Sequence, residues 1–131
     1  MKIIGNGAFF ECSSLAQVIL PESVERLGTG AFAGCRSLAS FSGKGVVIFE
    51  NFVFERTALT SFEIPEKTTK VSARTFLGTP VGEYTVQSGN TEFSAKDGVL
   101  FNADRSKLEI YPAEKEEKDY QIPEGCTEIG R

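Results

Sequence analysis

Apolar and polar positions recur at a fixed interval along most of the chain. Each copy of the pattern opens with an apolar residue, first at Ile4-Gly5 and again at Leu27-Gly28, a step of 23 residues. A small residue and a phenylalanine follow, then a cysteine, a leucine and a short alternating stretch. Two more divergent copies open at Phe49 and Val71, each after a step of 22 residues. A repeat of this length is typical of a solenoid, in which neighbouring copies stack and share one core.

Each copy is expected to form one coil of that solenoid. Leu15, Val18 and Leu20 show the two-residue alternation of a strand with one buried face, and Pro21 ends it. The stretch from Ala31 to Cys35 predicts a single helical turn with small and aromatic side chains directed inward. The fold class is therefore a β-rich solenoid of about four and a half coils, an α/β repeat with short helical turns.

One phenylalanine of each copy shares the buried phase of the pattern. We expect these residues to stack as an aromatic spine of the core, not to form a platform for a cofactor or sugar. The spine consists of Phe9, Phe32, Phe54 and Phe76. The position before it must stay small, and it holds Ala8, Ala31, Val53 and Thr75.

The repeat pattern is interrupted over residues 87–119. Two short strands are predicted at Asp97–Phe101 and Leu108–Pro112, separated by turn-forming residues. The mixed charges of Ala113–Asp119 indicate a solvated loop. We therefore divide the chain into repeats, an inserted β-hairpin module with a charged loop, and a resumed, truncated repeat, at residues 1–86, 87–119 and 120–131.

Both ends of the chain coincide with a boundary of the repeat. Ile129-Gly130 is the opening pair of a further copy, and Met1 precedes such a pair by two residues. We expect the chain to be part of a longer repeat protein, the alternative being a complete chain with atypical ends.

The motif I-G-x-x-A-F-x-x-C-x-x-L-x-x-I-x-L-P-x-S-V resembles the BspA-type leucine-rich repeat, a class found on surface proteins of bacteria and some protozoan parasites. The resemblance covers residues 4–86 and 120–130, and residues 90–112 resemble a hairpin module that recurs between repeats of that family. It implies a leucine-rich-repeat solenoid on a cell-surface or secreted, adhesin-like protein without catalytic activity.

The chain departs from this motif in its middle copies. Ser42-Gly43-Lys44-Gly45 replaces the Leu-Pro pair after Phe41. Threonine replaces cysteine at Thr57 and Thr79, and the stretch from Thr57 to Leu59 is one residue shorter than its counterpart. These departures predict a local irregularity of the solenoid.

Composition narrows the function further. The net charge is −4, which argues against a general nucleic-acid binder, and no apolar run approaches the roughly 20 residues of a membrane helix. The chain has no histidine, which excludes Ser-His-Asp and Cys-His catalysis and histidine-ligated metal sites.

The three cysteines allow two interpretations. Cys12 and Cys35 lie one period apart, so stacked coils bring them within the distance range of a disulfide. We favour the alternative that both are small core residues at a position that threonine takes in later copies. Cys126 is interpreted as a small apolar residue, and without a C-x-x-C motif a zinc or redox centre is unsupported.

Other candidate chemistry is weak. Gly28–Gly34 is too long for a dinucleotide fingerprint, and Gly43-Lys44-Gly45 lacks the flanking residues of a phosphate loop. The spacing of Asp97, Asn102 and Asp104 does not fit an EF-hand and indicates a turn. We expect no catalytic residue, no metal and no cofactor.

Glu63 and Glu83 are expected at equivalent exposed positions of consecutive coils, where a carboxylate pair would suit glycoside hydrolysis. Nothing near them in sequence predicts the apolar pocket that such a mechanism needs.

The outward positions of the predicted strands are the candidate binding residues. They form a polar to acidic row with one exposed isoleucine, which favours a protein or glycan partner over nucleic acid. The candidates are Gln17, Ile19, Ser40, Ser42, Ser61, Glu63, Glu83, Thr85, Gln87, Asp119 and Gln121.

The function expected from these observations is a non-catalytic module that binds a protein, such as host extracellular matrix, or a glycan. The alternatives are a structural spacer that displays another domain and, more remotely, a carboxylate-based glycoside hydrolase. We expect no direct insertion into a membrane. The terminal coils expose apolar residues near Phe9 and Ile129, which predicts end-to-end self-association.

Overall fold

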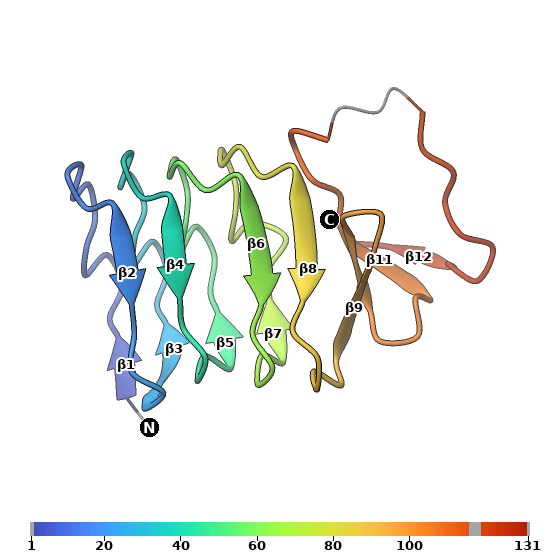
Figure 1. The fold of residues 1–131 in the computed structure, drawn as a ribbon, viewed down its shortest axis with the longest axis horizontal. Coiled ribbons are helices and arrows are strands. Elements are labelled where there is room, and N and C mark those ends of the chain that lie inside the picture. Colours follow the sequence, from blue (N-terminus) through green and yellow to red (C-terminus); the bar gives the residue numbers. More distant parts are fainter. Residues whose placement is uncertain (1, 116–118, 131) are drawn as a thin grey trace.

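The computed structural model describes residues 2–115 and 119–130, which form a β-solenoid of about six coils (Figure 1). Several short strands repeat along its axis, and each strand pairs with its equivalent in the next coil. The number of coils exceeds the four and a half expected. No helix is present among the described residues, so none of the described segments is long and apolar enough to span a membrane as a helix.

Two rows of parallel strands run along the solenoid (Figure 1). One row is a continuous four-stranded sheet of β1 (Lys2–Ile4), β3 (Val24–Leu27), β5 (Ile48–Phe49) and β7 (Lys70–Val71). The other row forms two separate two-stranded sheets. The first pairs β2 (Gln17–Ile19) with β4 (Ser40–Ser42), and the second pairs β6 (Ser61–Ile64) with β8 (Glu83–Val86).

The segments predicted as helical turns are hydrogen-bonded turns, so the prediction of helical turns is wrong. In the second coil the Phe32 N–H donates to Val53 O of the next coil at 2.9 Å, and the Gly34 N–H donates to Glu55 O at 2.8 Å. An α-helix would need these groups for bonds to its own preceding turn. Bonding between coils therefore replaces bonding within a helix.

The aromatic spine is confirmed. Successive rings of Phe9, Phe32, Phe54 and Phe76 have centroids 5.1, 6.0 and 5.5 Å apart, with interplanar angles of 7°, 7° and 18°. Phe32 and Phe54 are fully buried, whereas Phe9 of the first coil is 37% exposed. Thr75, the polar member of the small position, is also buried, and its hydroxyl donates to Glu50 O at 3.0 Å.

All three cysteines are free thiols in the part of the chain that the structure describes. Cys12 is exposed, Cys35 is buried and Cys126 is half-buried. Burial raises the pKa of the Cys35 thiol, which also lies 3.0 Å from the carbonyl oxygen of Phe9. Cys35 therefore fills the core as expected. The same expectation is wrong for Cys12, which is exposed in the first coil of the stack.

A four-stranded sheet follows the last pair of the second row. β9 (Phe93–Lys96) and β11 (Lys107–Ile110) each pair antiparallel with β10 (Val99–Asn102), and β12 (Glu128–Ile129) pairs parallel with β11. Val99, Phe101 and Leu108 form a small separate core with Tyr120 and Cys126 packed against it. The division of the chain at residues 86 and 119 stays a prediction, and residues 116–118 of the charged loop lie outside the described residues.

Candidate functional site

The strand face formed by β2, β4, β6 and β8 carries most of the predicted binding residues. Backbone register places Gln17 opposite Ser40 and Ile19 opposite Ser42. Most of the predicted side chains on these strands are exposed, and Ile19 is the most exposed large apolar residue, at 71%. The face is thus a polar surface with one isolated apolar side chain.

The register of β6 and β8 corrects the expected carboxylate pair. Ser61 lies opposite Glu83, and Glu63 lies opposite Thr85. Glu63 and Glu83 are therefore diagonal neighbours, not equivalent residues of consecutive coils. The expectation is wrong because a shift of two residues along a strand keeps a side chain on the same face but changes its partner.

Gln87 follows β8 and connects it to the preceding coil through hydrogen bonds. Its backbone N–H donates to Ile64 O at 2.9 Å, and its side-chain Oε1 accepts from the Glu66 N–H at 2.9 Å. The side chain is therefore oriented by the preceding coil.

Asp119 and Gln121 do not continue this face, because residues 119–123 belong to no strand. The next position beside β8 is taken by another segment, since the Tyr84 N–H donates to Gly98 O at 2.8 Å. Tyr120 instead packs against Tyr111, with ring centroids 5.1 Å apart. A part for Asp119 and Gln121 in binding stays a prediction.

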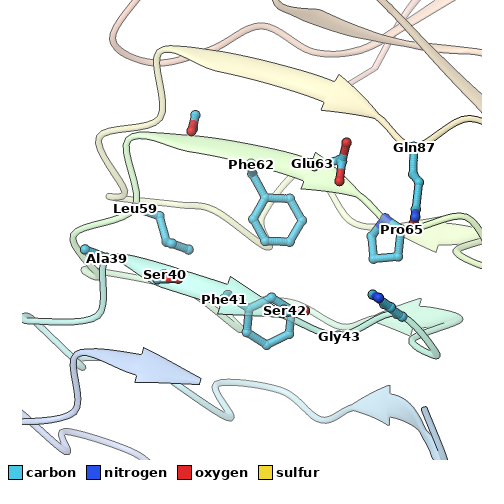
Figure 2. A pocket seen from close by; sticks show the side chains of 12 residues that line it. Ala39, Ser40, Phe41, Ser42, Gly43, Leu59, Phe62, Glu63, Pro65 and Gln87 are labelled. Atoms are coloured by element: carbon cyan, nitrogen blue, oxygen red, sulfur yellow. The ribbon is translucent and has the colours of Figure 1, made fainter. Parts of the chain in front are cut away.

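The strand face is interrupted between β4 and β6, which share no ladder. A hollow with a volume of about 290 Å³ lies at this break (Figure 2). Figure 2 shows the ring of Phe62 between the two strands and the ring of Phe41 at β4, with Ser40 and Ser42 along β4 and Glu63 on β6. We call this feature the β4/β6 hollow.

Repeat spacing explains the position of the break. Before it, the step from the cysteine position to the next leucine is three residues, as from Cys35 to Leu38. After it, the step is only two residues, as in Thr57 and Leu59. One residue fewer shifts the start of a strand by about 3.3 Å, so the ladders on the two sides do not match in register. The continuous β1–β3–β5–β7 sheet holds the coils together across this point.

The loop after β4 is shaped by two glycines. A Cβ atom on Gly45 would lie 1.9 Å from the carbonyl oxygen of Glu22, and one on Gly43 would lie 2.9 Å from the Phe41 ring and from Val46. Only glycine lets the backbone approach so closely. Lys44, between them, is exposed and lines the β4/β6 hollow.

Sequence reasoning did not select Phe41 or Lys44 as site residues. The available signal was the replacement of Leu-Pro by Ser42-Gly43-Lys44-Gly45, together with the shorter spacing at Thr57. From sequence, both predict only a local irregularity of the solenoid. The structure shows that they meet at one place on the strand face.

A second, more open hollow of about 560 Å³ lies on the other side of the β6–β8 pair. It is lined by residues of β8 and by the segment that leads into β9, including Thr85, Gln87 and Asn90. The β6–β8 pair is therefore a ridge between two depressions, with Ser61, Glu63, Glu83 and Thr85 exposed on it.

The described residues offer no group of three His, Cys, Asp or Glu side chains suited to a metal ion. Around the predicted turn, the Ser106 N–H donates to the Asp104 carboxylate at 3.0 Å, and the Lys107 N–H donates to Asn102 Oδ1 at 3.0 Å. Hydrogen bonding from Ser106 lowers the pKa of Asp104. These polar side chains organise a turn.

The continuous sheet on the other row has a different charge pattern. Glu50 accepts from Arg26 at 2.5 Å and lies 3.6 Å from the ammonium group of Lys70. These charges pair with one another across three coils. Lys44 and Glu63, the charged residues that line the β4/β6 hollow, form no ion pair with any residue that the structure describes.

Comparison with known families identifies the repeat. The BspA type leucine rich repeat region matches residues 1–97 in six copies. A search of curated proteins finds no significant match.

The chain is similar to three solved structures. The pneumococcal vaccine antigen PcpA is 27% identical with a TM-score of 0.88, over 99% of this chain and 33% of that one. A leucine rich cell surface protein from Faecalibacterium prausnitzii A2-165 is 29% identical with a TM-score of 0.80, over 93% and 33%. A leucine-rich repeat protein from Eubacterium ventriosum shares the fold at 21% identity, with a TM-score of 0.78 over 97% and 40%.

The chain spans between 33% and 40% of the length of these solved chains. Its strand rows, its stacked phenylalanines and the match over residues 1–97 agree on one assignment. The chain belongs to the BspA-type leucine-rich-repeat family.

Proposed function

We propose that this chain is a non-catalytic binding module of a cell-surface or secreted protein, and that it binds a protein or glycan through the strand face of β2, β4, β6 and β8. The observation that carries the proposal is the row of exposed polar side chains on these strands, hollowed on both sides of the β6–β8 ridge. Concave, polar surfaces on a rigid repeat scaffold are typical binding surfaces of solenoids.

The similar proteins support the location. One is described as a cell surface protein and another as a vaccine antigen, and both share more than a quarter of aligned residues with this chain. Absence of catalysis is part of the proposal, since the two carboxylates of the ridge are exposed and diagonal to each other. Both are exposed, whereas a catalytic general acid needs an apolar pocket around it.

Binding to a panel of immobilised extracellular-matrix proteins and glycans tests the proposal. The double variant Glu63→Lys/Glu83→Lys reverses the charge of the ridge and should weaken binding of the captured partner by at least about tenfold, or about 1.4 kcal/mol. Glu92→Lys/Glu124→Lys is the matched control, because it makes the same change of charge at exposed residues outside the four strands.

Equal loss of binding in both double variants would show a nonspecific charge effect and would contradict the choice of face. A chain that retains nothing from the panel would favour the structural spacer. Release of sugar from chromogenic glycosides would contradict the absence of catalysis.

A further inference from the structure

The β4/β6 hollow combines an aromatic floor with a polar rim at the centre of the strand face. We propose that it is a saccharide subsite that holds one neutral pyranose ring of a glycan, an assignment that rests on the proposed binding role of this face.

The floor is formed by two rings. Phe41 on β4 and Phe62 on β6 have centroids 5.9 Å apart and an interplanar angle of 24°. Phe41 is half-buried, whereas Phe62 is 6% exposed. The face of an aromatic ring carries partial negative charge and packs well against weakly positive hydrogens. The C–H groups on one side of a pyranose ring have this character.

The stacked floor also argues against an inserted peptide strand. Two strands without a shared ladder are the usual place for an extended segment to add to a sheet. Alternate side chains of such a segment would have to point into the core. The Phe41 and Phe62 rings already occupy that space. A flat ligand that lies on the rings meets no such obstacle.

The rim supplies donors and acceptors in the mixture that sugar hydroxyls require. Ser40, Ser42 and Ser61 present hydroxyl groups that donate and accept, Glu63 accepts, and Lys44 donates. Among the residues that the structure describes, these five side chains make no hydrogen bond or ion pair within the protein.

Gln87 completes the rim in a defined orientation. Its Oε1 accepts from the Glu66 N–H at 2.9 Å, which leaves the Nε2 group as a donor.

Charge and size narrow the ligand class. Lys44 and Glu63 are the only charged residues that line the hollow, and their charges cancel, which favours a neutral ligand over an anion or a cation. A volume of about 290 Å³ lies just below the range for ligand pockets, roughly 300–1000 Å³, and suits one ring of a longer glycan.

The backbone of the loop that carries Lys44 is held in place before any ligand arrives. Lys44 lies between Gly43 and Gly45, whose backbones pack against Phe41 and Glu22 too closely for any side chain. Preorganised groups lose little conformational entropy on binding. The loop that breaks the repeat therefore fixes the backbone from which the Lys44 side chain extends.

Titration of the isotopically labelled chain by amide NMR tests the assignment. The probes are glucose, galactose, mannose, N-acetylglucosamine, their β-linked disaccharides and, as a charged comparison, glucuronate. We expect at least one neutral sugar to shift the amides of residues 40–44 and 61–63, with a Kd on the order of 1 mM. Glucuronate should bind no better than its neutral counterpart.

Two variants and two controls locate the site. Lys44→Met and Glu63→Gln should each weaken sugar binding by about tenfold or more while the amide spectrum stays folded. Lys96→Met and Glu92→Gln make the same chemical changes at exposed residues outside the hollow and should leave the affinity unchanged.

The assignment is overturned if no sugar of the panel shifts these amides, if the shifts occur elsewhere, or if the controls lose as much affinity as the site variants. Shifts produced by an extended peptide and by no sugar would also overturn it. Failure of the proposed function is a different result, in which the chain captures no matrix protein or glycan at all. If only the saccharide assignment is wrong, Glu63→Lys/Glu83→Lys still weakens a captured partner whereas Lys44→Met does not.

Discussion

The thiol of Cys35 donates to the carbonyl oxygen of Phe9 in the preceding coil, with 3.0 Å between the two atoms. The hydroxyl of Thr79 makes the same contact with Phe54 O two coils later. Thr57, at the equivalent position between them, is buried, and its hydroxyl has no hydrogen-bond partner among the residues that the structure describes. Cysteine and threonine are thus interchangeable at this position, because both are small and can donate to a carbonyl oxygen of the aromatic spine. Of the three residues, Thr57 makes no such bond.

Replacement of these threonines by valine should have opposite consequences. Thr79→Val removes a buried hydrogen bond and leaves the Phe54 carbonyl without this donor, so the unfolding free energy should fall by about 1–3 kcal/mol. Thr57→Val removes a hydroxyl that has no partner and should leave stability unchanged or increase it by about 1 kcal/mol. Urea denaturation of both variants measures the difference. Equal losses would contradict the hydrogen-bond assignment.

Phe54 is the centre of the aromatic spine and contacts rings on both sides. Its centroid lies 4.9 Å from that of Phe41, 5.3 Å from Phe62 and 5.5 Å from Phe76. Phe54→Ala should lower the unfolding free energy by about 3–5 kcal/mol because it leaves a cavity among these rings. Leu77→Ala, at a residue that is 50% exposed, should change it by no more than about 0.5 kcal/mol. A small effect at Phe54 would show that neighbouring coils collapse into the space.

Gly45 is the glycine with the closest backbone contact. Gly45→Ala places a methyl group where it would be 1.9 Å from Glu22 O, so the loop has to move and the unfolding free energy should fall by about 2 kcal/mol or more. Gly125→Ala is the matched control, since nothing lies within 4 Å of its Cβ position. Thermal unfolding of the two variants is the measurement. Similar midpoints would show that the loop after β4 adapts without strain.

Alkaline pH should weaken the fold through Tyr84. Burial raises the pKa of this phenol above its ordinary value of about 10. Above about pH 10 the unfolded chain releases the phenol proton and the folded chain keeps it. The contribution of Tyr84 to the unfolding free energy is therefore complete below about pH 10 and is lost as the pH rises.

Tyr84→Phe removes this group and should make the alkaline part of the stability curve less steep. Tyr111→Phe changes an exposed tyrosine and should keep the slope of the parent chain. The measurement is the urea midpoint of each variant between about pH 8 and pH 11. This interval covers about 2 pH units below and 1 above the ordinary pKa of tyrosine. An unchanged slope in Tyr84→Phe would assign the alkaline effect to other groups.

Exposed apolar side chains at the two ends of the fold should promote association between copies of the chain. Ile3 and Phe10 are 55% and 54% exposed at one end, and Ile122 and Ile129 are 48% and 56% exposed at the other. The average mass in light scattering should rise with concentration, and Ile3→Ser/Phe10→Ser should reduce the rise. Constant mass across concentrations would contradict self-association.

Repeat length, spine and core positions were predictable because each depends on residues within one coil and on their recurrence. Phe9, Phe32, Phe54 and Phe76 could be aligned by counting along the chain, and a buried phase that recurs in every copy places them along one core. The hydrogen bonding of the turns, which the sequence predicts as helical, was not predictable in the same way. Whether the Phe32 N–H bonds within its own coil or to Val53 of the next is decided by the neighbour, which a single copy does not contain.

Tertiary structure decided the candidate site. Pairing of Glu63 with Thr85 instead of Glu83 depends on register between strands, and a small slip in register changes every partner. Opening of the sheet between β4 and β6 depends on two coils of different spacing meeting side by side. The sequence by itself determined which residues face inward and which coil each belongs to, because hydrophobic burial follows a local period. Neighbouring coils alone determined which exposed side chains meet around Phe41 and Phe62, because strand pairing is a relationship between residues that are distant in sequence.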